Sequence, residues 1–207
     1  MKKVVLIAAL MLFGVMANAQ ENLYLVFEFM KVDNEQEKAY AETEGLWQKL
    51  HEARVERGDI IGWDFWALRP GGEDQSFQYL TVTLFNDPVK MMEGGSFQEA
   101  FDAAFPNISA EEEKIMNATA KTRDLAVRIY TQEILATKSK PGADMPLGTV
   151  AQIDMMKVDM MNYATYEKAE EEVFMPLHQK AVDAGEKMNW GLIRFMTLLE
   201  VIPTPLT

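Results

Sequence analysis

The spacing of apolar positions alternates along the chain between the period of a strand and the period of a helix. Each change of period marks the start of a new element. Residues 23–32 are apolar with few polar positions between them, which predicts a strand buried on at least one face. The stretch up to Arg57 repeats apolar residues every three or four positions and is followed by Gly58, which predicts an amphipathic helix. The later segments predict strands at 60–68, 77–85 and 125–134, and helices at 89–105 and from Ser109.

This order of elements predicts an α+β fold. Strand, helix, strand, strand, helix, strand is the order of a ferredoxin-like unit. Residues 150–158 predict one more strand, with which the order begins again. We therefore expect a first ferredoxin-like unit over residues 20–137, a linker over 138–147 and a second unit over 148–207.

The second run of predicted elements also repeats the amino-acid sequence of the first. The segment Met30-Lys31-Val32-Asp33 recurs as Met156-Lys157-Val158-Asp159. Later positions recur with unchanged spacing: Glu44, Trp47, His51, Gly58 and Trp63 correspond to Glu171, Phe174, His178, Gly185 and Trp190. Such self-similarity at a fixed period indicates a tandem duplication.

The second copy stops before its pattern is complete. In a ferredoxin-like sheet the third strand lies between the first and the second, and the chain ends at Thr207, shortly after the second strand of the copy. We expect a second unit truncated after its second strand, with unpaired backbone groups on both sides of a gap. Residues 198–207 can be encoded by codons that, when read in a shifted frame, give a Pro-Gly-Gly turn like that at 70–72. A frameshift is therefore our hypothesis for this end of the chain.

Residues 1–19 have the three regions of a secretory signal peptide. Lys2 and Lys3 precede an apolar run, and Ala17-Asn18-Ala19 follows it as a cleavage site. We expect a mature chain that begins at Gln20 and is periplasmic or secreted. The sequence has no cysteine to carry a lipid and no later apolar run of about 20 residues, so we expect no membrane anchor.

The chain is acidic, with 20 Lys and Arg against 32 Asp and Glu and a formal net charge of −12. Cleavage after Ala19 would remove Lys2 and Lys3 and leave 18 basic residues against the same 32 acids, or −14. Nucleic acids and anionic lipids are bound by clustered Lys and Arg, so this balance argues against both partners. An acidic surface that keeps an exported protein soluble accounts for the charge.

The repeated helix and strand resemble a known superfamily. Trp47, His51, Gly58 and Trp63, together with their counterparts in the second copy, are similar to tandem members of the dimeric α+β barrel superfamily, and more narrowly to its uncharacterised secreted members. The resemblance implies two four-stranded sheets packed face to face as a barrel with helices outside. The superfamily includes cofactor-free monooxygenases, haem-binding and haem-degrading enzymes, and proteins of unknown activity. Function on such a fold has to be argued from the site.

The two histidines of the chain occupy the same place in both copies. Glu44, Trp47 and His51 share one helix face at intervals of three and four residues, and so do their counterparts. One interpretation is a paired site in which His51 and His178 act as axial haem ligands or as proton shuttles oriented by glutamate. The other is packing that a duplicated helix retains.

Acidic and aromatic positions supply further candidates. Glu28 lies on the first strand, where it could act as a base in a pocket or pair with a cation such as Arg128. Trp63 and Trp66 could line a helix–sheet cleft or belong to the core. The candidate ligand-binding residues are therefore Glu28, Glu44, Trp47, His51, Trp63, Trp66, Phe174, His178 and Trp190.

The sequence shows no Ser-His-Asp arrangement, no His-rich metal motif and no phosphate loop, so we assign no catalytic residue and no metal site. We expect an exported protein that binds a small apolar or aromatic molecule in its helix–sheet cleft, with haem as one candidate. Two alternatives stay open: a cofactor-free monooxygenase-like enzyme, and a structural or partner-binding module, for instance in a homo-oligomer. A ligand retained through purification would favour binding, and substrate-dependent oxygen consumption would favour the enzyme.

Overall fold

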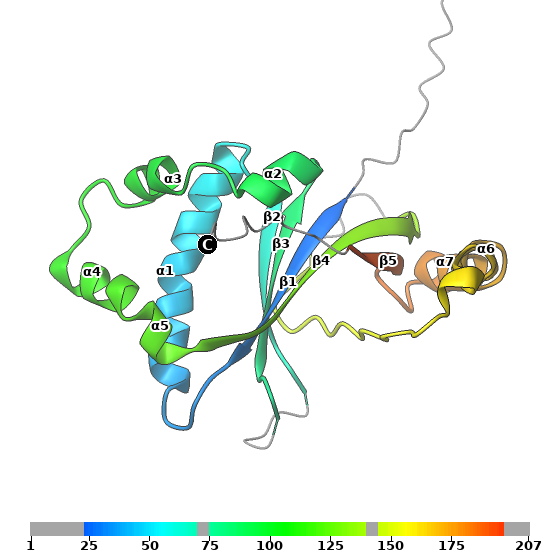
Figure 1. The fold of residues 1–207 in the computed structure, drawn as a ribbon, viewed down its shortest axis with the longest axis horizontal. Coiled ribbons are helices and arrows are strands. Elements are labelled where there is room, and N and C mark those ends of the chain that lie inside the picture. Colours follow the sequence, from blue (N-terminus) through cyan, green and yellow to red (C-terminus); the bar gives the residue numbers. More distant parts are fainter. Residues whose placement is uncertain (1–22, 70–74, 140–144, 197–207) are drawn as a thin grey trace, which may run out of the picture.

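The structure is a computed structural model that describes residues 23–69, 75–139 and 145–196. Its strands form one antiparallel sheet in the order β2-β3-β1-β4-β5 (Figure 1). The strands are β1 (Tyr24–Lys31), β2 (Gly62–Ala67), β3 (Tyr79–Phe85), β4 (Asp124–Ala136) and β5 (Gly191–Met196). The first four strands have the ferredoxin-like order that the sequence predicts. The frameshift hypothesis and the signal peptide concern residues outside the described ranges.

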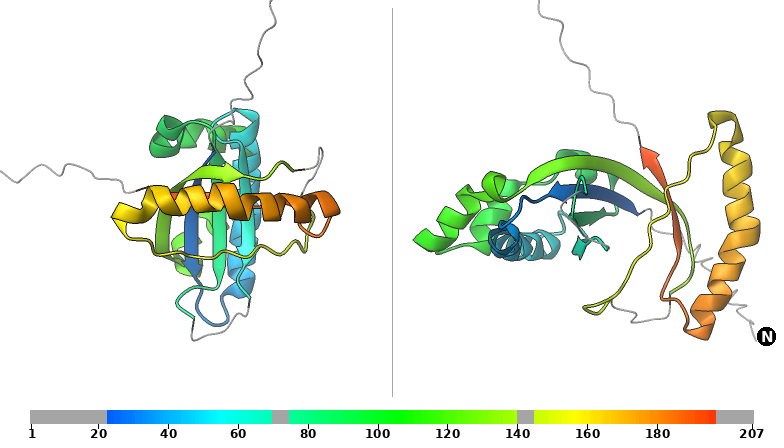
Figure 2. Two further views of the ribbon diagram at one scale, coloured as in Figure 1. Left: turned by 90° about the vertical axis from the view of Figure 1, so that its right-hand side faces the viewer. Right: turned by 90° about the horizontal axis from the view of Figure 1, so that it is seen from below.

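Helices lie on both sides of this sheet. On one side α1 (Glu37–Glu56) covers the sheet, and four shorter helices surround it (Figure 1). These are α2 (Pro88–Glu93), α3 (Phe97–Ala104), α4 (Ala110–Asn117) and α5 (Thr119–Thr122). On the opposite side lies an arm formed by η1 (Met160–Asn162), α6 (Tyr163–Ala169), η2 (Glu170–Phe174) and α7 (Met175–Ala184) (Figure 2).

Local sequence signals explain where the shorter helices begin and end. The helical pattern over 89–105 is divided between α2 and α3, because Gly94 and Gly95 have φ angles of 75° and 73°. Glycine adopts this left-handed conformation without strain, and it ends a helix. Ser109 and Glu112 form a capping box at the start of α4, as their spacing predicts.

An apolar face holds α1 in place. Leu50 has no exposed surface and packs with Leu46, Ala100 and Phe105 from α1, α3 and the residue that follows α3. The chain leaves α1 at Gly58, whose φ of 73° is again left-handed. This turn leads into β2 next to the last turns of α1, and it fixes which α1 side chains face the first residues of β2.

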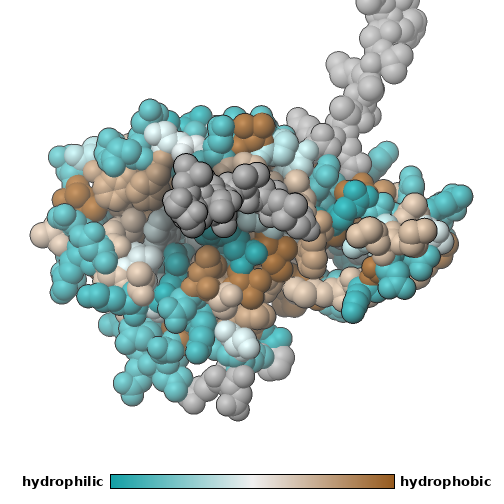
Figure 3. All heavy atoms as spheres, in the orientation of Figure 1, coloured by the Kyte–Doolittle hydropathy of each residue, from teal (hydrophilic) through white to brown (hydrophobic). Residues whose placement is uncertain are grey.

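The two faces of the sheet carry separate apolar clusters. Alternate side chains of β1 point to opposite faces and so contribute to both. On the α1 side the buried cluster is Tyr24, Val26, Ile60, Phe85 and Met91. On the other side it is Phe27, Phe29, Leu80 and Val82. Figure 3 shows hydrophobic residues gathered over the middle of the sheet, between α1 and the arm.

The long strand β4 connects the two parts of the chain. It pairs with β1 along most of its length and with β5 near its end, and its register with β5 shifts between Glu133 and Leu135. An irregularity of this kind bends a strand, and β4 curves away from α1 in Figure 1. The described residues therefore form one five-stranded sheet, whereas the resemblance implied two four-stranded sheets.

The strand predicted at 150–158 is absent, and this prediction is wrong. These residues make no backbone–backbone hydrogen bond with any part of the chain that the structure describes, and all except Val158 are exposed. In the first copy, β3 lies between β1 and β2 and pairs with both. Within the described ranges no strand takes that position in the second copy. An alternating pattern of apolar residues is not enough to form a strand, because the backbone N–H and C=O groups need a neighbouring strand as hydrogen-bond partner.

The arm corresponds in sequence to α1 but is less covered. Its helical elements follow one another from Tyr163 to Ala184, with the π-helical turn η2 just before Pro176. Proline lacks the N–H that regular α-helical bonding would use, which accounts for a widened turn at this point. Leu177 is 56 % exposed, whereas its counterpart Leu50 is fully buried. Leu50 is covered by Ala100 of α3 and by Phe105, and within the described ranges the second copy has no counterpart of α3.

Candidate functional site

A cleft of about 480 Å³ lies between α1 and the sheet face that α1 covers. Side chains of α1 and of strands β1 to β4 form most of its wall, and α2 and the residues around α5 complete it. This volume is within the usual range of small-molecule sites. The cleft brings together five of the nine sequence candidates: Glu28, Glu44, Trp47, His51 and Trp63.

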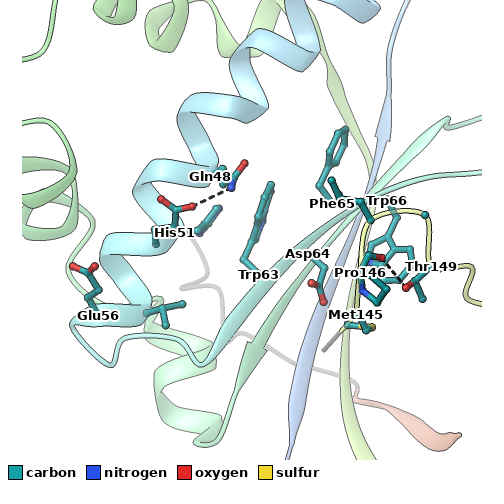
Figure 4. Close-up of a pocket in the computed structure, with 14 residues that line it drawn as sticks. Gln48, His51, Glu56, Trp63, Asp64, Phe65, Trp66, Met145, Pro146 and Thr149 are labelled. Atoms are coloured by element: carbon teal, nitrogen blue, oxygen red, sulfur yellow. Dashed lines mark hydrogen bonds between the residues drawn. The ribbon is translucent and has the colours of Figure 1, made fainter. Parts of the chain in front are cut away.

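Stacked rings form one wall of this cleft. The His51 ring stacks on Trp63 with centroids 4.8 Å apart and planes inclined by 17°, and Trp47 lies 5.9 Å from His51. Trp63 also stacks on Phe65, with centroids 6.3 Å apart. Figure 4 shows the His51 and Trp63 rings side by side between α1 and β2. Consecutive turns of α1 and alternate positions of β2 therefore present one continuous aromatic surface.

His51 is buried and neutral. Burial, with smaller effects from the nearby Arg54 and Arg123, lowers its pKa from about 6.5 to about 3. Nη1 of Arg54 lies 3.1 Å from Nδ1 of His51. A guanidinium can only donate, so Nδ1 is the acceptor and the single hydrogen of the neutral ring lies on Nε2. His51 is thus a fixed hydrogen-bond donor at its outer nitrogen and not a group that changes charge near neutral pH.

This state of His51 predicts a pH-dependent stability. The pKa of His51 is lower in the folded than in the unfolded chain, so its contribution is complete above pH 6.5 and is lost as the pH falls toward 3. Relative to a His51→Gln variant, the wild type should lose about 2 kcal/mol of unfolding free energy between pH 7 and pH 5. Urea titrations at the two pH values measure this difference.

His178 is the matched control for that experiment, because it is more exposed and its pKa is lowered less decisively by burial and by Lys187. A His178→Gln variant should retain most of the wild-type slope. If His51→Gln has the same pH dependence as the wild type, His51 titrates normally in the folded protein and is not buried there as the structure describes.

Haem is the cofactor that the resemblance introduces, with His51 or His178 as axial ligand. Axial ligation needs a ring nitrogen without hydrogen. At both histidines a cation occupies Nδ1: Arg54 at His51, and Lys187, whose Nζ lies 3.0 Å away, at His178. The hydrogen therefore lies on Nε2 in each ring. These residues do not fit an axial haem ligand.

Glu44 and Arg123 form a buried ion pair beside the aromatic wall. Arg123 Nε donates to Glu44 Oε1 at 3.0 Å, and only 4 % of the Glu44 side chain is exposed. Burial raises the pKa of Glu44, and Arg123 opposes this shift. The Arg123 guanidinium also lies 5.9 Å from the Trp47 ring. Glu44 thus serves to hold Arg123 in the cleft wall.

Glu28 pairs with Arg128, which is the structural alternative that the sequence suggested for this acid. Arg128 Nε donates to Glu28 Oε1 at 2.8 Å, and β1 and β4 place the two residues directly opposite each other. This pair is more open to solvent, since 47 % of the Arg128 side chain and 22 % of the Glu28 side chain are exposed. Glu28 therefore faces the cleft as half of an ion pair.

Trp66 does not line the cleft, contrary to the grouping made from the sequence. It lies three residues after Trp63 on β2 and so points to the other sheet face, where it packs against the cluster around Phe27. Trp66 instead lines an outer groove of about 610 Å³ between α1, β2 and residues 145–149 (Figure 4). The lining of this groove includes Glu52, Glu56 and Asp64 but no Lys or Arg.

The candidates from the second copy lie in the arm and in the residues leading into β5, away from the cleft lining. His178 nevertheless stacks on Trp190 as His51 stacks on Trp63, with centroids 4.9 Å apart and planes inclined by 19°. Gly185 has a φ of 79°, close to that of Gly58. Phe174, however, is 47 % exposed. The ring pair is therefore present twice, whereas every residue that lines the cleft belongs to the first copy.

The sequence analysis missed two arginines of the cleft. Arg54 lies three residues after His51, which places it on the same face of α1, so the helical spacing could have identified it. Arg123 follows α5 outside any periodic segment, and it is 79 positions from Glu44. Only the folded chain brings these two together.

Two further classes of site were sought in the described ranges. No group of three or more His, Cys, Asp or Glu side chains there could hold a metal ion. Among the described helices, none is long and apolar enough to cross a membrane.

Comparison with known proteins gives a coarse likeness of fold. No family model and no curated protein matches the chain. Among solved structures, the chain is similar to a mutant of SnoaB, a cofactor-independent oxygenase from Streptomyces nogalater, with 13 % sequence identity and a TM-score of 0.29. The match covers 58 % of this chain and 98 % of that one.

Proposed function

We propose that this protein binds a small aromatic molecule in the cleft between α1 and the sheet. The observation that carries the proposal is the aromatic wall of Trp47, His51 and Trp63 along a cavity of about 480 Å³. Rings that stack on one another within a protein can also stack on an aromatic ligand. Such a ring pair contributes about 1 kcal/mol of binding free energy in addition to the contribution of the buried area.

Binding is favoured over catalysis by the chemistry of the same residues. A general base works best when its pKa lies near the operating pH, but the pKa of His51 is lowered to about 3. Glu28 and Glu44 are each held by an arginine. His51 therefore cannot serve as the general base of the cofactor-free oxygenase alternative near neutral pH, and the two acids of the cleft are already engaged by arginines.

We further propose that the chain is a tandem α+β barrel protein whose second unit, within the described ranges, has no strand in the central position. The sequence repeat, the repeated stack of histidine on tryptophan and the unpaired segment 150–158 support this interpretation. The edge of β5 that pairs with no described strand and the exposed arm would then be the places where a homo-oligomer or a partner could form. The proposal that the protein is exported rests on the signal-peptide pattern of residues 1–19.

A fluorescent probe tests the proposed binding site. N-phenyl-naphthylamine is neutral and aromatic, and its emission rises when it leaves water. We expect it to bind the wild type and to bind at least tenfold more weakly to Thr83→Phe, which fills the cleft from β3. The control is Val55→Phe, a change in the outer groove only. Equal binding to all three proteins would contradict the proposal.

A further inference from the structure

The charged groups of the cleft leave one arginine without an acid. Glu28, Glu44, Arg54, Arg123 and Arg128 line the cavity, and the two acids pair with Arg128 and Arg123. Arg54 forms no ion pair within the described ranges. The cleft thus holds an excess of one positive charge in a chain whose formal net charge is −12.

Arg54 is also held in place with unused donors. Its Nη1 contacts Nδ1 of His51 at 3.1 Å, and its Nη2 donates to the carbonyl oxygen of Gly94 at 2.8 Å. A guanidinium has five N–H groups, so most of them have no protein partner among the described residues. The two contacts tie the side chain to α1 and to the end of α2, and they fix it in the wall of the cleft.

The acids closest to Arg54 do not supply the missing charge. Asp59 and Glu28 are the two whose charges act on it. Asp59 accepts from Arg57 at 3.0 Å, and Glu28 accepts from Arg128. A half-buried cation without a paired anion, as Arg54 is, carries part of the cost of burying an unpaired charge, and a ligand that brings a negative charge would remove that cost.

We infer that the ligand of this cleft is an aromatic molecule with a single anionic group, which binds Arg54 while its ring lies against Trp47 and Trp63. A carboxylate fits best, because its two oxygens match the fork of a guanidinium. This inference rests on the proposed function and specifies its ligand class. Arg54 is then the residue that selects anionic over neutral aromatic molecules.

Two probes with one skeleton test the inference. Anilinonaphthalene sulfonate carries an anionic group that N-phenyl-naphthylamine lacks. We expect Arg54→Met to weaken binding of the sulfonate by roughly 10- to 100-fold, the usual effect of losing a charge-assisted hydrogen bond, and to leave binding of the neutral probe within about twofold. Arg54→Lys should lie between Arg54→Met and the wild type for the sulfonate, because it keeps the charge but loses the fork.

Lys49→Gln is the matched control, since Lys49 is a cation on the same helix, pairs with Glu112 and does not line the cleft. It should bind both probes like the wild type. Unchanged binding of the sulfonate to Arg54→Met would overturn the inference, and so would an equal loss of both probes, because Arg54 would then support the cleft and not the anion. If neither probe responds to Thr83→Phe, the proposed function itself fails.

Discussion

Replacement of Arg123 by methionine is expected to lower the free energy of unfolding by about 3 kcal/mol. The change leaves Glu44 as a carboxylate with only 4 % of its side chain exposed and without its partner. Burial already raises the pKa of Glu44, and loss of Arg123 would raise it further. The destabilisation should therefore shrink as the pH falls and the buried Glu44 carboxylate takes up a proton. Urea denaturation at pH 7 and pH 4 measures both effects.

Arg128→Met is the control for this prediction, because it breaks an ion pair that is more open to water. Such pairs contribute at most about 1 kcal/mol. The double variant Glu44→Met with Arg123→Met should recover most of the stability, since it removes the buried charge as well. Equal losses for Arg123→Met and Arg128→Met would show that the Glu44 pair is not buried in solution.

Leu50→Ala is expected to cost about 3 kcal/mol, whereas Leu177→Ala should cost less than about 0.5 kcal/mol. The two leucines are counterparts in the repeat, but Leu50 is fully buried and Leu177 is 56 % exposed. Removal of a buried leucine leaves a cavity, and removal of an exposed one does not. The unfolding free energies of the two variants, compared with that of the wild type, give the result.

This comparison also reports on the second copy in solution. If Leu177→Ala destabilises the protein as much as Leu50→Ala does, α7 has a partner that covers it. A sedimentation measurement on the same samples would then show whether that partner is a second copy of the chain. A small effect supports the exposed arm that the structure describes.

Much of the first unit could be predicted from local patterns. The helical spacing before Gly58 predicts α1, Ser109 and Glu112 predict the start of α4, and the strand order follows from the sequence of elements. The pairing of Glu28 with Arg128 was one of two alternatives for that acid. These features depend on neighbours in the chain or on one strand pair, which is why the sequence carries them.

Other features depend on contacts that no local pattern encodes. The alternation at 150–158 is that of a strand, but a strand forms only beside another one. The outward position of Trp66 was available from its odd spacing after Trp63, and grouping the two by residue type obscured it. Arg123 enters the cleft from a non-periodic segment. The ligand class therefore emerges only when the charges of several elements are brought together.

The four tryptophans of the chain report on whether the cleft between α1 and the sheet is the binding site. Trp47 lines only the cleft, Trp63 lines both cavities, Trp66 lines only the outer groove, and Trp190 lies just before β5. Their four indole N–H signals can be followed in one nitrogen–proton NMR spectrum while anilinonaphthalene sulfonate is added. If the probe binds in the cleft, the signals of Trp47 and Trp63 shift together and saturate, while those of Trp66 and Trp190 stay in place. A shift of Trp66 or Trp190 with Trp47 unmoved would contradict binding in the cleft.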